Sequence, residues 1–190
     1  GVGRRLLQPA SAIMGQSDLR RTARPELERL SEVARETINL SMLLEHEIFY
    51  LDKVETHRSM VCKTQVGSRV PAYATGSGKI MLAGQSMEYI DQYCQWMAEG
   101  ARPLTANTIT DPDQLRQALV LARTRGFAVD DGEIEEGLTC VAAPIYDMNQ
   151  RVAAAVSISG PTYRMEEDWE MMIREVCKTA ANISRLLGHR

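Results

Sequence analysis

Hydroxyl, thiol and carboxyl side chains gather in the last third of the sequence. Cys140 lies in the first of two neighbouring apolar segments, and Ser157 and Ser159 lie in the second. Alternate residues of a β-strand share one face, so the two serines point the same way, and two preceding alanines, Ala153 and Ala155, extend that face. Small and hydroxyl-bearing side chains fill a core poorly. The pattern therefore predicts the floor of a pocket for a small polar ligand.

A second cluster of small residues is the run Gly76-Ser77-Gly78-Lys79. It is not a Walker A phosphate loop, because Tyr73 and Ile80 stand where that motif needs Gly and Ser or Thr. What remains is a tight turn that enters a helix. Backbone N–H groups at such a helix start attract anions such as a carboxylate, although the glycines could equally serve chain geometry alone.

Catalytic constellations are absent from the sequence. The histidines His46, His57 and His189 are scattered, and no Ser-His-Asp or Cys-His arrangement is supported. From the residues alone, Asp130 is one more acid of an acidic loop, and Cys140 is a small buried hydrophobic residue. We therefore expect no catalytic residues.

The charge balance limits the partners of the chain. Lysine and arginine number 22 against 25 acidic residues, so the net charge is −3. Nucleic-acid binding needs clustered basic side chains, which argues against DNA binding by this chain alone. The first 35 residues differ, because seven arginines outnumber four acids and give +3. Charge patterning alone attributes this excess to a solvated helix face.

The composition is that of one cytoplasmic domain. The chain has 190 residues, of which 44% are hydrophobic, enough for a sizeable core. There is no apolar run of membrane-spanning length and no signal peptide, so no membrane partner is expected. The four cysteines are widely spaced without a C-x-x-C pair, which excludes the usual zinc patterns. We expect free thiols, no metal and no cofactor.

Hydrophobic periodicity predicts helices, then strands, then helices, strands and a final helix. A first helix over Asp18–Glu36 contains Pro25, which should kink it. A helix that starts with Asp111 as N-cap and Pro112 should end at Gly126, and a last helix should begin at Glu166. Other helices are expected near Ser77 and over Ser86–Met97, and a loop is expected over Gly67–Pro71. The expected strands are Thr37–Leu43, Ile48–Val54, Met60–Thr64, Phe127–Asp130, Thr139–Tyr146 and Val152–Ser159. This order predicts an α+β fold with a largely antiparallel sheet.

Two sequence blocks carry a resemblance to a known family. V-G-S-R-V-P-A-Y-A-T-G-S-G-K-I-M-L begins at Val66, and the stretch that holds G-L-T-C and S-I-S-G follows Asp130. Together they resemble the effector-binding domain of the IclR family of bacterial transcriptional regulators, from about Leu19 to Leu187. The resemblance implies a GAF-like sheet of six strands. It also implies that residues 1–17 end an interdomain linker helix and that residues 18–190 form the effector domain.

The resemblance also assigns a ligand site. The family's effector pockets use the positions of Gly76, Ser77, Asp130, Leu138 and Cys140, with the two serines of S-I-S-G, Ser157 and Ser159. A pocket wall is implied at Ser59, Cys62 and Val70. Only Val70 is apolar there as the family pattern expects. The departures at Ser59 and Cys62 hint at a more polar ligand.

The implied function is control of transcription. The chain is expected to bind a small organic acid effector and to form a homodimer or homotetramer. Operator DNA would be bound only through a winged helix-turn-helix domain outside this chain, in a repressor of a catabolic operon. Two alternatives use Cys140: a thiol enzyme on a GAF-like sheet, or a cysteine redox sensor.

Overall fold

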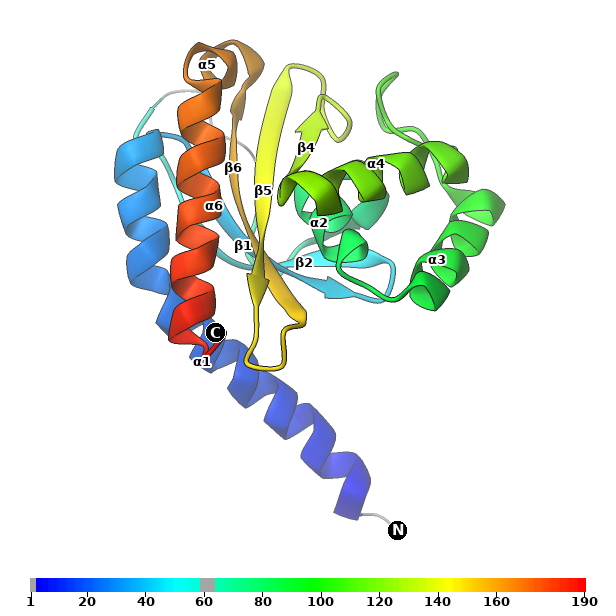
Figure 1. The fold of residues 1–190 in the computed structure, drawn as a ribbon, viewed down its shortest axis with the longest axis vertical. Helices are drawn as coiled ribbons and strands as arrows, with labels where there is room; N and C mark the ends of the chain where they lie inside the picture. The colour runs from blue at the N-terminus through cyan, green and yellow to red at the C-terminus, as the bar shows by residue number, and fades with distance from the viewer. Residues whose placement is uncertain (1–2, 59–63) are drawn as a thin grey trace.

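A six-stranded antiparallel sheet forms the centre of the molecule (Figure 1). The computed structural model describes the backbone of residues 3–58 and 64–190, and the side chains of residues 15–58 and 64–190. The strand order is β3-β2-β1-β6-β5-β4. The strands are β1 (Thr37–Leu44), β2 (Glu47–Val54), β3 (Arg69–Pro71), β4 (Ala128–Asp131), β5 (Leu138–Tyr146) and β6 (Val152–Pro161). The predicted α+β, GAF-like architecture is confirmed.

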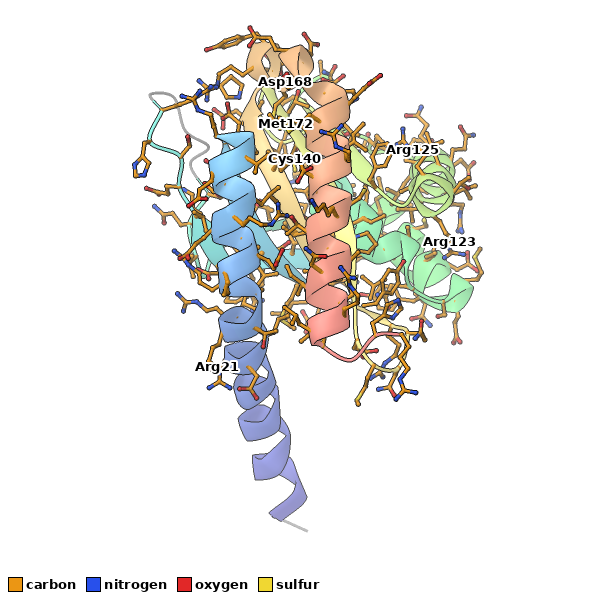
Figure 2. The ribbon with its side chains drawn as sticks, turned by 60° about the vertical axis from the view of Figure 1, so that its left-hand side comes forward. Arg21, Arg123, Arg125, Cys140, Asp168 and Met172 are labelled. Atoms are coloured by element: carbon orange, nitrogen blue, oxygen red, sulfur yellow. The ribbon has the colours of Figure 1, made fainter. Side chains whose placement is uncertain are left out.

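Helices cover both faces of this sheet. Along the described chain they are α1 (Gly3–Ala34), a 3-10 turn (Ala72–Ala74), α2 (Gly76–Ala83), α3 (Met87–Gly100), α4 (Pro112–Arg125), α5 (Thr162–Glu167) and α6 (Trp169–Leu186). Figure 2 shows α1 and α6 side by side in front of the sheet, and α2, α3 and α4 lie on its other side. No described helix is long and apolar enough to cross a membrane.

The face under α1 and α6 holds one hydrophobic core. The apolar residues expected to recur along both helices lie in it, from Leu19 to Ala34 on α1 and from Met172 to Ile183 on α6. They pack against alternate residues of the strands, such as Val141 and Val156. Burial of one such large apolar side chain contributes about 1.5–3 kcal/mol.

The opposite face is built from smaller side chains. Ala128, Ala142 and Ala155 are buried there against α2. Gly78 of α2 lies so close to the 3-10 turn that a Cβ would be 2.0 Å from the carbonyl oxygen of Ala72. The face of β6 that carries small side chains therefore has two roles. Its alanine end allows α2 to pack closely, and its serine end borders a cavity.

Local helix signals read from the sequence are confirmed. The side chain of Asp111 accepts a hydrogen bond from the Gln114 amide at 2.8 Å, and Pro112 is the first residue of α4. Gly126 ends α4 with a φ of 79°. Helix α1 is continuous through Pro25 and ends where Arg35 takes a φ of 55°. It therefore covers both the expected linker segment and the first helix of the domain.

Two expected boundaries are wrong. The segment expected as a loop over residues 67–71 contains β3, which pairs with β2 through Ile48 and Val70. As a short edge strand it tolerates Pro71, which lacks an N–H to donate. The expected last helix is two helices, because Asp168 leaves helical geometry at a φ of −126° and ψ of 33°. Of the strand expected over residues 60–64, only Thr64 is described, and it is not in a strand.

Candidate functional site

A cavity of about 190 Å³ lies between the start of α2, the segment 131–137 and the α2 side of the sheet. The predicted site residues that line it are Val70, Ser77, Asp130, Leu138, Cys140, Ser157 and Ser159. A larger hollow at the end of α1 is lined by exposed charged residues such as Glu32 and Arg35, and none of the predicted residues that the structure describes line it.

Strand register brings these residues together. Asp130 on β4 lies opposite Cys140 on β5, and Cys140 lies opposite Ser159 on β6. Directly opposed residues of antiparallel strands share a face, so all three point to the cavity. Ser157 is two residues before Ser159 and shares that face. The pocket floor expected from serine spacing is therefore where the cavity lies.

The start of α2 offers two free backbone donors. The Thr75 hydroxyl caps the helix by accepting from the Gly78 amide at 2.9 Å. No described acceptor pairs with the amides of Gly76 and Ser77. Gly76 is not among the residues that line the cavity. It packs against β4, where an added Cβ would lie 3.3 Å from the Ala128 carbonyl oxygen. The positive end of the helix dipole favours an anion beside these amides.

Buried charges hold the loop over the cavity. The ammonium group of Lys79 pairs with the carboxylate of Glu133, and both side chains are buried. Lys79 is the lysine of the run that does not match the Walker A motif. In this structure it pairs with a carboxylate. Asp130 accepts a hydrogen bond from the Glu133 amide at 2.7 Å. Burial nevertheless raises the pKa of Asp130 to about 7, and the Glu133 carboxylate acts in the same direction.

The segment 131–137 is shaped by two glycines and fastened from outside. Gly132 and Gly137 have φ values of 65° and 77°, a region that L side chains rarely adopt. The Thr108 hydroxyl donates to the Glu133 carbonyl oxygen at 2.6 Å. The Thr105 hydroxyl donates to the Gly132 carbonyl oxygen at 2.6 Å. The segment is therefore a structured cover, which we name the lid.

Further lining residues were missed by sequence reasoning: Tyr50, Thr64, Ser68, Thr75, Ile134 and Glu135. The alternation of Ser68 and Val70 could have indicated two residues on one face of an edge strand. Thr64 has no comparable signal, because its partner Asn39 is 25 residues away. The predicted wall residues Ser59 and Cys62 lie outside the described residues.

Chemistry at the cavity depends on what surrounds Cys140. Cys140 is buried, and no histidine is among the described lining residues. Burial raises the pKa of the thiols of Cys94 and Cys177, which pack on opposite faces of the sheet. The described part of the chain holds no cluster of three metal-ligating side chains. The arrangement favours binding by hydrogen bonds over reaction at sulfur.

Comparison with known proteins agrees with this geometry. Residues 11–185 match the family described as bacterial transcriptional regulator IclR, C-terminal. The regulator BhcR of Paracoccus denitrificans is 38% identical over 87% of the chain and 59% of its own length. The transcriptional repressor IclR of Escherichia coli is 32% identical over 88% of the chain and 61% of its own length.

A solved structure gives the same fold. An IclR homologue from Microbacterium hydrocarbonoxydans, complexed with 4-hydroxybenzoate, superposes with a TM-score of 0.82 at 27% identity, covering 90% of this chain and 69% of that one. The chain belongs to the IclR family and corresponds to its C-terminal, effector-binding domain. It spans about 60% of the length of the first curated relatives.

Proposed function

We propose that this chain senses a small carboxylate metabolite and controls DNA binding by a separate winged helix-turn-helix domain. The cavity at the start of α2 carries the proposal. There the amides of Gly76 and Ser77 have no partner among the described residues, and Ser77 lines a cavity whose floor holds Ser157 and Ser159. Two free donors at the positive end of a helix are suited to a carboxylate group.

The bound relative supports the choice of ligand class. The Microbacterium homologue holds 4-hydroxybenzoate, a carboxylate with a hydroxyl group at its far end. In this chain the acid group would lie at Gly76, Ser77 and the two serines. Asp130, Leu138 and Cys140 would contact the rest of the ligand from β4 and β5. Val70 would form the apolar wall, together with Ser59 and Cys62.

Binding would act through a shift between arrangements of subunits. Ligand under the lid stabilises one arrangement of a homodimer or homotetramer, and the spacing of the DNA-binding domains changes with it. Coupling of this kind is typically about 1–3 kcal/mol, enough for a regulatory switch without chemistry. The Escherichia coli relative is named a repressor, which supports repression of a catabolic operon as the role.

A catalytic role is less well supported. A nucleophilic Cys140 needs its pKa lowered, and although the start of α2 borders the cavity, no described histidine lines it to act as a base. Cys94 and Cys177 lie on opposite faces of the sheet, which argues against a disulfide between those two. We therefore propose a binding domain that performs no turnover.

The test is a thermal-shift screen of small organic acids on the wild-type chain and on Ser157→Ala/Ser159→Ala. A ligand that binds only the folded state raises Tm by mass action, so a matching acid should raise the wild-type Tm. The double variant should fold normally and lose that response. Ser41→Ala is the matched control, because Ser41 is buried on β1, opposite Ala155, and does not line the cavity. An undiminished response from the double variant would remove the serines from the site.

A further inference from the structure

Polar side chains cross the cavity floor from one strand to the next. Asp130 of β4 lies opposite Cys140, which lies opposite Ser159 of β6, and two residues away on β6 Ser157 lies opposite Asn39 of β1. Neighbouring strands are about 4.8 Å apart, so the two ends of this row are separated by roughly 14 Å. A ligand with polar groups at one end only would leave part of the row without partners.

The β1 end is closed by a threonine-asparagine pair. The Thr64 hydroxyl donates to Asn39 Oδ1 at 2.9 Å, and Thr64 lines the cavity. Asn39 Nδ2 in turn reaches Ser159 Oγ at 3.5 Å. Because Ser159 accepts this bond, its own proton stays available to a ligand. Lys53 fixes the pair from behind by donating to the Thr64 carbonyl oxygen at 2.8 Å.

Hydroxyls without a described partner lie both on the cavity floor and at the start of α2. Ser157 and Ser77 are 1% and 2% exposed, and neither hydroxyl has a hydrogen-bond partner among the described residues. Both line the cavity, so their hydroxyls are open to its contents. Each hydroxyl can donate one hydrogen bond to a ligand oxygen and accept another. The apolar lining residues, Val70, Ile134 and Leu138, do not lie on this serine row.

We infer that the effector is an open-chain, polyhydroxylated carboxylic acid that lies across the strands. Its carboxylate takes the start of α2 together with Ser157 and Ser159, and its hydroxyl groups meet Thr64 and Asp130. The inference rests on the proposed function and adds Thr64 and Asn39 as residues that determine specificity.

The experiment compares matched acids. The chain is titrated with gluconate and shorter aldonic acids, with aliphatic acids of the same carbon count such as hexanoate, and with benzoate. Binding is followed by Tm and by calorimetry. We expect the aldonic series to contain the strongest ligand, and Thr64→Val to weaken it up to about tenfold, the scale of one hydrogen bond. Affinity for aliphatic acids should not fall in that variant.

Two further variants separate binding from folding. Thr64→Ser keeps the hydroxyl and should restore affinity for the aldonic acid. Thr124→Val removes an exposed hydroxyl that bonds within α4 and should change nothing. Equal or stronger binding of hexanoate or benzoate would overturn the hydroxylated class and leave the carboxylate sensor standing. No response to any acid of the three sets would overturn the proposed function and this inference with it.

Discussion

Asp130 shows how burial at the site changes the behaviour of a single residue. Its carboxyl is 2% exposed and lies beside Glu133, so the pKa is raised to about 7 although the Glu133 amide donates to it. Near neutral pH the charged and neutral forms of Asp130 are both populated. A neutral Asp130 donates a hydrogen bond to a ligand, and a charged one accepts, so both forms bind a hydroxyl group.

Removal of this titration should flatten the pH dependence of stability. Between the ordinary aspartate pKa and about 7, the folded chain holds a proton that the unfolded chain has released. Stability therefore falls as pH rises through this window, by at most about 1.4 kcal/mol per pH unit. Asp130→Asn should lose that slope in urea unfolding measured from pH 4 to 7, and exposed Asp113→Asn should keep it. A slope unchanged in Asp130→Asn would mean that the carboxyl is charged in the folded state throughout.

At the scale of elements, α2 and the lid are joined by the buried pair of Lys79 and Glu133. The lysine comes from the first turns of α2, and the glutamate comes from a segment 54 residues later. A buried ion pair contributes little to net stability, but removal of one partner leaves an uncompensated charge. The pair therefore fixes where the lid closes more than how strongly the domain folds.

A double-mutant cycle tests this role. Lys79→Met should destabilise the domain by about 3–5 kcal/mol, because Glu133 remains buried without its counter-charge. Adding Glu133→Leu should restore part of that loss, since the pair is then replaced by apolar side chains. Urea denaturation of Lys79→Met, Glu133→Leu and the double variant measures the loss of stability in each and the coupling between the two groups. Additive losses in the double variant would show that the two groups are not coupled.

The elements also show what sequence can predict. Helix α4 was predictable because Asp111, Pro112 and Gly126 act on neighbouring backbone. The serine floor was predictable because strand alternation is a local rule, and the family resemblance added Asp130 and the start of α2. Strand β3 was missed because three residues show no periodicity. Contacts such as Thr64 with Asn39 were out of reach, since they depend on how distant strands meet.

At the scale of the molecule, α1 is fastened to the sheet by arginines. Asp52 of β2 is 2% exposed and faces α1, where Arg24 donates to its Oδ1 at 3.1 Å and Arg20 lies 3.4 Å from its Oδ2. Arg24 also donates to the Lys53 carbonyl oxygen at 3.0 Å. Lys53 lies opposite Asn39, which closes the β1 end of the cavity together with Thr64. The contacts of Arg24 therefore lie close to that end of the cavity.

Loss of Arg24 should loosen α1 selectively. Arg24→Met leaves Asp52 with the half-exposed Arg20, and we expect a loss of about 1–3 kcal/mol. Hydrogen exchange should quicken in residues 18–34 and stay unchanged in β5. Arg21→Met is the matched control, since Arg21 is exposed on α1 (Figure 2) and its partner among the described residues is the exposed Asp18. Surface pairs contribute about 0–1 kcal/mol, so that variant should behave as wild type. Equal exchange in both variants would show that Arg24 does not hold the helix.

The reach of α1 has a mechanical consequence. Among the described side chains, from residue 15 onward, core contacts of α1 begin at Leu19, and the preceding turns project away from the body of the molecule (Figure 1). At 1.5 Å per residue, residues 3–18 form a lever arm of roughly 24 Å beyond that pivot. A tilt of about 10° at the pivot would move the tip by roughly 4 Å, comparable with the rise of one base pair, about 3.4 Å. A tilt too small to disturb the core would thus be amplified several-fold along this arm.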